Sequence, residues 1–332
     1  MKKLRWGLIG ATTIARDWMI PAMRQTGGEV VAIMSSDATR GAAFADKNGL
    51  ARHTTELSEL LADDIDAVYI STTNELHAQQ TIAALEAGKH VLCEKPLATS
   101  MEDALAMLKA AEDAGRVFAT NHHLRNAGTH RAMQRAIASG AIGKPLFARV
   151  FHARYLPENL QGWRLPRPEA GAGVVLDITT HDIDTLRFLL NDEPRSVICL
   201  TQQGGLAQGQ VEDGAMSVFE FESGLLAQTH DAFTTKYAST GLEIHGTDGS
   251  LIAVDVMTQE PIGEVLLRTA EGTKPLEVER NNLYEHGLAL FANAVEGKGQ
   301  PAASGLDGVR SLAAGIAALE SARTGKNVSI PS

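Results

Sequence analysis

The stretch WGLIGATTIA, residues 6–15, decides the fold that the sequence predicts. Trp6–Ile9 is a short apolar run typical of a buried strand, and Gly10 follows it where a helix is expected to begin. The dinucleotide fingerprint Gly-x-Gly-x-x-Gly/Ala requires this strand–turn–helix setting. Gly10 and Ala15 fit it, whereas Thr12 replaces the middle glycine and can offer its hydroxyl to a phosphate oxygen. Alone the match is weak, because a glycine at such a turn is often purely structural.

The first 120 residues continue the alternation of strand and helix patterns. Strands are expected at Trp6–Ile9, Val30–Met34, Ala67–Ile70, His90–Cys93 and Val117–Thr120. Helices are expected at Ile14–Arg24, Arg40–Lys47, Glu56–Leu61, Leu76–Ala87 and Met101–Ala114. Short strands alternating with helices predict an α/β fold, with a doubly wound parallel sheet in an N-terminal Rossmann domain over residues 1–121.

After residue 121 the pattern changes. A helix at Thr129–Ser139 and a strand at Leu146–Ala153 precede a loop rich in Pro, Arg and Gly and a helical run at Val174–Leu190. Later strands are joined by hairpin-type turns at residues 222–224, 246–249 and 271–272. Residues 122–332 therefore predict an α+β substrate-binding domain with an open, mainly antiparallel sheet. Its C-terminal helices, Tyr284–Val295 and Asp307–Arg323, could pack back on the first domain.

Composition narrows the class of protein. The 332 residues are 44% hydrophobic and 21% charged, which suits a soluble globular chain of two domains. The formal net charge of -10 argues against general binding to nucleic acid or anionic membranes. Two cysteines, Cys93 and Cys199, form no disulfide framework and favour the cytoplasm. No signal peptide or membrane span is expected, which leaves a small molecule as partner and the oligomeric state open.

The end of the second strand indicates which dinucleotide binds. An NAD site usually has Asp or Glu there for the ribose 2′-hydroxyl. Ser35 and Ser36 stand there instead, and Arg40 can form a forked pair with a 2′-phosphate. We predict NADP(H) over NAD(H). The alternative is that Arg40 is a solvated first-turn residue and that Asp37 serves NAD(H).

Two further strand ends carry polar side chains. After the fourth strand, residues 71–77 read STTNELH and suit contacts to the cofactor, although N-capping by Thr73 or Asn74 explains them equally well. The apolar strand pattern that ends at Cys93 is followed by Glu94-Lys95-Pro96. At the carboxyl end of a strand in an open α/β sheet, side chains face the ligand crevice. Lys95 is therefore a candidate catalytic residue.

The second chemical cluster is DITTHDID, residues 177–184. If it is helical, Asp177, His181 and Asp184 share one face. A histidine beside a carboxylate can act as general acid with an orienting partner. The alternative is a capped helix start with a satisfied core histidine. A metal site is not expected, because no third ligand has convincing spacing.

The chain resembles the Gfo/Idh/MocA oxidoreductases over essentially its whole length. The motifs that carry the resemblance are Gly10–Ala15, Glu94-Lys95-Pro96, Gly171-x-Gly173, Asp177-x-x-x-His181-x-x-Asp184 and Gly246-Thr247-x-Gly249. The resemblance implies a Rossmann domain followed by an open-sheet α+β domain. It also implies reduction of a sugar-derived 2-ketone with NADPH.

The resemblance also implies roles for single residues. Lys95, Asp177 and His181 form the catalytic set and contact the substrate together with Tyr284. His181 delivers the proton and Lys95 stabilises the developing negative charge. The predicted cofactor-binding residues are Gly10, Ala11, Thr12, Thr13, Ile14, Ser35, Ser36, Arg40, Thr72, Thr73, Asn74, Glu75, Leu76, His77, Glu94, Lys95, Asn121, Trp163 and Arg164.

Two other functions stay open from the sequence. One is NAD-dependent oxidation of another sugar or a cyclitol, which a substrate panel would distinguish. The other is a regulator that binds NADP without turnover. A regulator predicts degraded catalytic residues, whereas Lys95, Asp177 and His181 are all present.

Overall fold

The computed structural model describes residues 3–62 and 64–331. The chain forms two compact units. The first unit comprises residues 1–123 and 284–309, and the second unit comprises residues 124–283 and 310–332. The chain therefore leaves the first unit once, returns to it late, and ends in the second.

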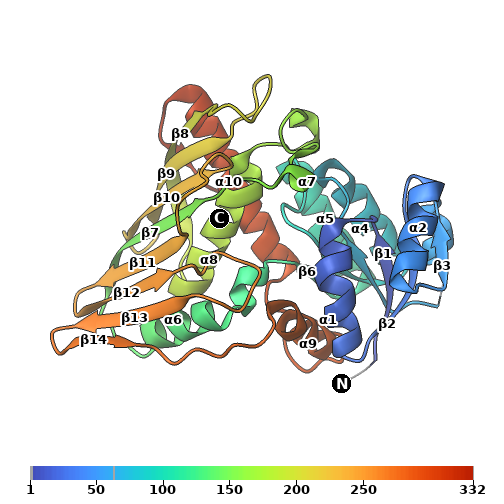
Figure 1. The fold of residues 1–332 in the computed structure, drawn as a ribbon, viewed down its shortest axis with the longest axis horizontal. Helices are drawn as coiled ribbons and strands as arrows, with labels where there is room; N and C mark the ends of the chain where they lie inside the picture. The colour runs from blue at the N-terminus through green and yellow to red at the C-terminus, as the bar shows by residue number, and fades with distance from the viewer. Residues whose placement is uncertain (1–2, 63, 332) are drawn as a thin grey trace. The chain divides into compact units, whose positions relative to one another are not determined.

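Within the described residues, the first unit holds a six-stranded sheet in the order β3-β2-β1-β4-β5-β6 (Figure 1). Each neighbouring pair runs parallel. The order runs outward from β1 in both directions, so the predicted doubly wound sheet is confirmed, and ligands of such sheets bind where the order reverses. The strands are β1 (Arg5–Ile9), β2 (Glu29–Met34), β3 (Arg52–Thr54), β4 (Ala67–Ile70), β5 (His90–Cys93) and β6 (Phe118–Thr120).

The helices of the first unit start and stop at residues suited to those places. Asp37 accepts a hydrogen bond from the Arg40 amide at 2.7 Å, and Ser100 accepts one from the Asp103 amide at 3.1 Å. Gly115, at φ +58°, ends α5 in the left-handed conformation that glycine tolerates best. The helices are α1 (Ile20–Gln25), α2 (Ala38–Asn48), α3 (Leu57–Leu61), α4 (His77–Glu86), α5 (Met101–Ala114) and α9 (Leu283–Val295).

Two details of the first unit differ from the sequence prediction. The helix expected at Ile14–Arg24 begins as a π-helical turn, Ala15–Met19, and continues as α1. The short strand β3 was not predicted, because Arg52-His53-Thr54 lacks an apolar alternation. It lies at the edge of the sheet and pairs only with β2 among the described strands.

Helix α9 belongs to the core of the first unit. The ring centroids of Trp6 and Phe291 lie 5.3 Å apart, and those of Trp18 and Tyr284 lie 5.5 Å apart. Both pairs fall in the range at which aromatic rings attract each other. The apolar cluster also includes Tyr69 of β4. One hydrophobic core therefore joins the start of the chain to a segment near residue 290.

In its described part, the second unit contains a nine-stranded sheet in the order β14-β13-β12-β11-β7-β10-β9-β8-β15. Strands β7 and β10 pair parallel, and the other neighbouring pairs run antiparallel, which confirms the predicted mainly antiparallel sheet. The strands are β7 (Pro145–Ala153), β8 (Pro194–Gln202), β9 (Gly214–Phe221), β10 (Leu226–Ala232), β11 (Gly241–Gly246), β12 (Gly249–Val254), β13 (Glu264–Thr269), β14 (Gly272–Pro275) and β15 (Val328–Ser329).

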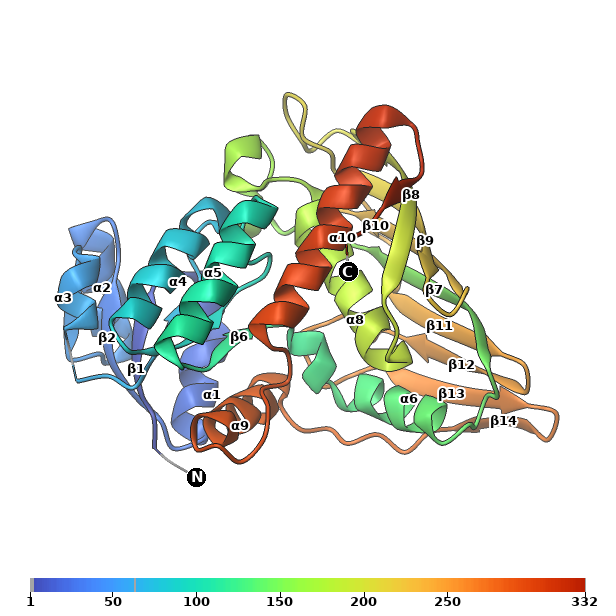
Figure 2. The same cartoon turned by 180° about the vertical axis from the view of Figure 1, so that it is seen from behind.

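Helices cover one face of this second sheet, as Figure 2 shows for α6, α8 and α10. The other face exposes apolar side chains, among them Leu200 and Phe147. The helices of this part are α6 (Gly128–Ala138), α7 (Glu158–Gln161), α8 (Thr180–Leu190) and α10 (Gly305–Thr324), which runs from the first unit into the second. Helix α8 follows a π-helical turn, Val175–Thr179.

Candidate active site

The turn after β1 is built around Gly10. Its φ of +111° is unfavourable for other residues, and a Cβ there would lie 3.1 Å from the backbone of Ser71 and Thr72. The fingerprint glycine thus lets the turn after β1 approach the turn after β4. Ala11, Thr13 and Ile14 follow it, partly exposed, before the π-helical turn.

Thr12 uses its hydroxyl inside the protein. The hydroxyl oxygen lies 2.8 Å from that of Ser71, and it also accepts the Ala15 amide at 3.3 Å. A hydroxyl has one donor hydrogen and two acceptor lone pairs, so a third partner remains chemically allowed. The side chain that replaces the middle glycine therefore ties the first turn to the loop after β4. The predicted bond from Thr12 to a phosphate stays a prediction.

Ser35, Ser36 and Arg40 lie together at the end of β2. Arg40 donates from Nε to Ser35 Oγ and from Nη2 to Ser36 Oγ, both at 3.1 Å. Asp37 caps α2, where it accepts the Arg40 amide. One oxygen of the carboxylate that could have served a ribose hydroxyl is thus engaged in the helix cap. An exposed guanidinium held over two hydroxyls is chemically suited to a phosphate monoester.

The loop after β4 carries Thr72, Thr73, Asn74, Glu75 and Leu76 into a short 3-10 turn, Asn74–Leu76. Thr72 Oγ1 lies 2.6 Å from Gln80 Oε1, so this hydroxyl donates to α4. Thr73 and Glu75 are partly exposed, Leu76 is exposed, and Asn74 is buried. The loop beside Gly10 therefore exposes both polar and apolar side chains.

His77 is fully buried at the start of α4. Its Nδ1 lies 2.9 Å from the Pro96 carbonyl oxygen and its Nε2 lies 3.2 Å from that of Thr72. Burial, the largest effect, lowers the pKa of His77, so the neutral ring, with one N–H to donate, is favoured. The ring links the loop after β4 to the loop after β5. With no exposed surface, it could influence a cofactor only through these two loops.

Glu94 is held from both neighbouring strands. Its Oε1 accepts the Tyr69 hydroxyl at 2.5 Å and the Asn121 amide at 2.6 Å. Burial raises the pKa of Glu94, and these two bonds oppose that effect. Lys95 follows, half-buried, before the buried Pro96. The first unit thus gathers Gly10, Ser35, Glu94 and Asn121 after the carboxyl ends of neighbouring parallel strands.

Tyr69 was not singled out from the sequence. A tyrosine within the apolar strand Ala67–Ile70 is ordinarily a core residue, and its ring does lie in the apolar cluster. The available signal was its hydroxyl, because a buried Tyr O–H usually has a hydrogen-bond partner. Burial, together with the charge of Glu94, holds the pKa of Tyr69 well above its usual range.

Tyr284 has a core position in the first unit. It is 2% exposed, and its ring stacks on His123 with centroids 5.6 Å apart. These contacts explain its place at the start of α9 without a ligand. Its predicted contact with the substrate stays a prediction.

In the second unit, Trp163, Arg164 and Asp177 form a connected group. The Arg164 guanidinium lies 4.8 Å from the ring centroid of Trp163, a cation–π distance. Its Nε donates to Asp177 Oδ2 at 3.2 Å. Since Arg164 is only partly exposed, the charge of Asp177 is compensated within the protein. The sequence predicts that Asp177 orients His181. The structure shows that Arg164 is a partner of the Asp177 carboxylate.

His181 lies in the first turn of α8 and is 6% exposed. Asp177 precedes it in the π-helical turn, so the two are not spaced along one regular α-helix as the sequence predicted. Asp184 serves the fold: Arg125 donates to it from Nε and Nη2 at 2.8 and 2.7 Å, and both side chains are buried. The helix that carries His181 is thus held in place by the buried ion pair between Arg125 and Asp184.

A buried acidic cluster includes Asp182 of this helix and Asp231 of β10. His152 Nδ1 is 2.8 Å from Asp182 Oδ1, and Thr179 donates to Asp231 Oδ2 at 2.5 Å. Burial, reinforced by the neighbouring Asp182 carboxylate, raises the pKa of Asp231 well above its ordinary value. In the described residues, no group of three or more His, Cys, Asp or Glu side chains is arranged to hold a metal ion.

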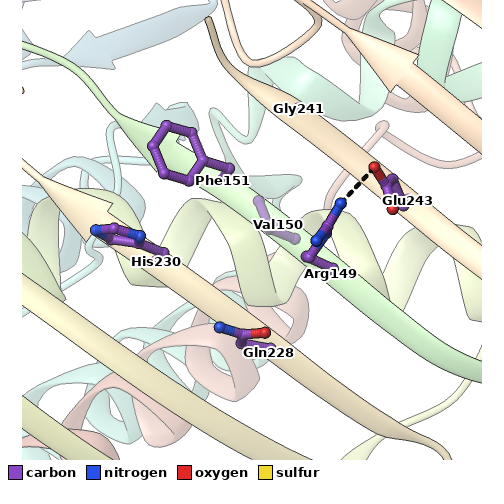
Figure 3. Close-up of a pocket in the computed structure, with 7 residues that line it drawn as sticks. All are labelled: Arg149, Val150, Phe151, Gln228, His230, Gly241 and Glu243. Atoms are coloured by element: carbon purple, nitrogen blue, oxygen red, sulfur yellow. Dashed lines mark hydrogen bonds and ion pairs between the residues drawn. The ribbon is translucent and has the colours of Figure 1, made fainter. Parts of the chain in front are cut away.

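A hollow of about 360 Å³ lies on the face of the second sheet turned away from α8 (Figure 3). Gly241 pairs with Phe151 and leaves space where a side chain would stand. Arg149 and Glu243 form an ion pair of 2.7 Å at its side, and His230 packs edge-on against Phe151. None of the residues predicted for the active site lines this hollow.

In the described part of the chain, no helix is long and apolar enough to cross a membrane.

Known proteins resemble this chain over nearly its whole length. A family model described as an oxidoreductase family with an NAD-binding Rossmann fold, Gfo/Idh/MocA, matches residues 4–122, and the Gfo/Idh/MocA C-terminal domain model matches residues 130–252. The chain is 60% identical to the 1,5-anhydro-D-fructose reductase of Ensifer adhaerens over 98% of each chain. It is 29% identical to D-xylose 1-dehydrogenase (NADP(+)) 2 of Haloferax volcanii over 98% of this chain and 100% of that one.

A solved structure shows the same fold. The aldose-aldose oxidoreductase from Caulobacter crescentus, complexed with glycerol, has a TM-score of 0.90 to this chain at 24% identity. The match covers 99% of this chain and 100% of that chain.

Proposed function

The chain belongs to the Gfo/Idh/MocA family of oxidoreductases, and from that premise we propose that it reduces the 2-keto group of 1,5-anhydro-D-fructose with NADPH to give 1,5-anhydro-D-mannitol. The observation that carries the proposal is the 60% identity to a reductase of this name across both units. A likeness that covers 98% of each chain includes the cofactor half and the substrate half together.

The preference for NADPH is supported by the end of β2. No carboxylate follows the strand at residue 35, and Asp37 uses one of its oxygens to cap α2. The Arg40 guanidinium, bonded to Ser35 and Ser36, would pair with a 2′-phosphate through charged hydrogen bonds. The residues after β1 and β4, from Gly10 to Ile14 and from Thr72 to Leu76, would hold the pyrophosphate and the nicotinamide side.

The proposed mechanism assigns a separate role to each predicted catalytic residue. The residues after β1 and β4 would hold NADPH, which would supply the hydride for the ketone carbon. His181 donates a proton to the oxygen as negative charge develops there, so that C=O becomes CH–OH. Lys95 stabilises that charge electrostatically, and Asp177 keeps the imidazole oriented. Tyr284, Trp163 and Arg164 would contact the substrate or the nicotinamide end.

The direct test is the reaction itself. Purified protein mixed with NADPH and 1,5-anhydro-D-fructose should consume NADPH, and the product should be identified as 1,5-anhydro-D-mannitol by mass and NMR spectra. A panel of other keto-sugars, and of sugars and cyclitols with NAD(P)⁺, provides the comparison. A higher kcat/KM for one of those compounds would replace the proposed substrate, whereas tight NADPH binding without any turnover would indicate a regulator.

Two substitutions test the roles of the catalytic residues. His181→Asn should lower kcat by roughly 10²–10⁴-fold, the usual loss of a positioned general acid. Lys95→Ala should impair turnover and nicotinamide binding together. Full activity of His181→Asn would remove that residue from the mechanism, and unchanged kinetics and binding in Lys95→Ala would do the same for Lys95.

We also assign the protein to the cytoplasm, a proposal that both cysteines support because they are buried as free thiols.

A further inference from the structure

Strand register brings Tyr69, Glu94 and Asn121 onto one face of the first sheet. Tyr69 pairs with Leu92, and Glu94 lies two residues beyond Leu92, so both side chains point to the same face. On the other side, Thr120 pairs with Cys93, which sets Asn121 opposite Glu94. The three residues come from β4, from the end of β5 and from the end of β6.

Both neighbours donate to the same oxygen of Glu94. The Tyr69 hydroxyl lies 2.5 Å from Oε1 and the Asn121 amide lies 2.6 Å from it. Backbone bonds tie the same strand ends together, from the Glu94 amide to the Ile70 carbonyl and from the Asn121 amide to the Cys93 carbonyl. Two short bonds from opposite sides fix the carboxylate in one orientation, and Lys95 is the next residue along the chain.

Tyr69 is suited to hold this position. It is completely buried, in the apolar cluster that joins α1, β4 and α9. Its ring cannot move without opening that core, because protein interiors are close-packed. A hydrogen bond to a charged group is also stronger than one between neutral groups.

We propose that Tyr69 is a positioning residue of the reductase: its hydroxyl orients Glu94, and through Glu94 it sets Lys95 at the edge where the nicotinamide and the ketone meet. The inference rests on the proposed function for the role of Lys95. It extends that function to a side chain with no exposed surface. Tyr69 itself touches neither substrate nor cofactor.

Tyr69→Phe removes the hydroxyl and keeps the ring. The variant should lower kcat/KM by about 10-fold, which corresponds to the lower end of the free energy of one hydrogen bond to a charged group. The Kd for NADPH, measured by fluorescence titration, should rise as well. This binding measurement does not depend on the identity of the ketone, so it separates failure of this inference from failure of the proposed substrate.

A matched control removes another buried hydroxyl nearby. Thr120 donates to the Ser304 carbonyl at 3.1 Å, and its side chain points to the opposite face from Asn121. Thr120→Val should lower the thermal stability to a similar extent and leave kcat/KM and the Kd for NADPH unchanged. Equal kinetic losses in Thr120→Val and Tyr69→Phe would reduce Tyr69 to a structural residue and overturn the proposal.

The decisive experiment is a double-mutant cycle with Glu94→Ala. Because the hydroxyl acts through Glu94, adding Tyr69→Phe to Glu94→Ala should have little further effect on either measurement. If Tyr69→Phe changed kcat/KM and the Kd for NADPH by the same factor with and without Glu94→Ala, the inference would be overturned. Wild-type kinetics and binding in Tyr69→Phe would overturn it as well. If Glu94→Ala does not fold, the comparison of Tyr69→Phe with Thr120→Val decides the question alone.

Discussion

Arg40 is the residue on which the choice of cofactor depends. Replacing it by serine removes the guanidinium that is bonded to Ser35 and Ser36. We expect kcat/KM with NADPH to fall by roughly 10–100-fold, because a hydrogen bond to a charged group contributes about 1.5–3 kcal/mol. The value with NADH, which has no 2′-phosphate, should change little, and steady-state kinetics with both cofactors measures the ratio.

Arg24→Ser is the control for this prediction. Arg24 is an exposed arginine of α1 that donates to the Asn48 carbonyl, near the segments that lead into the amino ends of β2 and β3. Its removal should leave the NADPH/NADH ratio unaltered. An equal loss with both cofactors in Arg40→Ser would contradict the assignment of Arg40 to the 2′-phosphate.

At the scale of single residues, the sequence indicated positions better than contacts. Ser35 and Arg40 were predicted as neighbours of one cofactor group, and the structure bonds them to each other. Thr12 and His77 are still only predicted to contact the cofactor, and the sequence did not indicate the contacts of their polar atoms with Ser71, Thr72 and Pro96. Such bonds depend on how close separate strand ends approach, and side-chain type alone does not carry that information.

At the scale of elements, the turn before α8 positions Asp177 and His181. Gly173 adopts a φ of +108°, and a Cβ there would lie 2.2 Å from Glu212 Oε1. That same oxygen accepts the Val175 amide at 3.1 Å, so Glu212 caps the π-helical turn. The glycine leaves the space that the capping carboxylate occupies.

Gly173→Ala should therefore destabilise the helix start. Backbone strain costs about 1–3 kcal/mol, and the displaced carboxylate adds to it. We expect the melting temperature, measured by circular dichroism, to fall by about 4 °C or more, and kcat to fall with it. Gly209→Ala is the control, since Gly209 also has a positive φ but no atom within 4 Å of an added Cβ. A smaller loss of stability in Gly173→Ala than in Gly209→Ala would refute the role of the cap.

Two of the helices that follow predicted ligand-binding segments begin with a π-helical turn, at Ala15–Met19 and Val175–Thr179. Apolar periodicity predicted each as part of one continuous helix. An i→i+5 turn takes up about one more residue than an α-helical turn, and a run of apolar residues does not by itself show which of the two turns it forms. Such turns are frequent at functional sites, so the two irregularities fall where the proposed function needs them.

At the scale of the whole molecule, the alternation of strand and helix patterns predicted the parallel sheet, and the hairpin-type turns predicted the mainly antiparallel sheet. Buried titratable groups could not be predicted in this way, because burial is set by packing between distant segments. His130 of α6 is completely buried, and burial lowers its pKa to about 4. The carbonyl of Leu124 opposes this shift only in part. His130 is therefore mostly neutral in the folded chain at pH values above its pKa of about 4.

This burial makes folding sensitive to acid. In the unfolded chain a histidine binds a proton below about pH 6.5, so the unfolded state holds more protons than the folded state between that pH and about 4. The contribution of His130 is fully present above pH 6.5 and is lost as the pH falls. The loss approaches about 1.4 kcal/mol for each pH unit once the unfolded histidine is protonated, so acidification from pH 6.5 to 5 should remove about 1.6 kcal/mol of unfolding free energy.

His130→Gln removes the titrating group, so its curve of unfolding free energy against pH should be flatter by that amount between pH 6.5 and 5. Urea unfolding at several pH values measures both curves, and only their slopes are compared, because the substitution itself changes stability. His230→Gln, on the exposed face of the second sheet, should keep the wild-type slope because it leaves His130 in place. Parallel curves for His130→Gln and the wild type would show that this histidine titrates alike in both states. The acid sensitivity would then have to arise from other buried groups, of which His77 is the next to test, because burial lowers its pKa in the same direction.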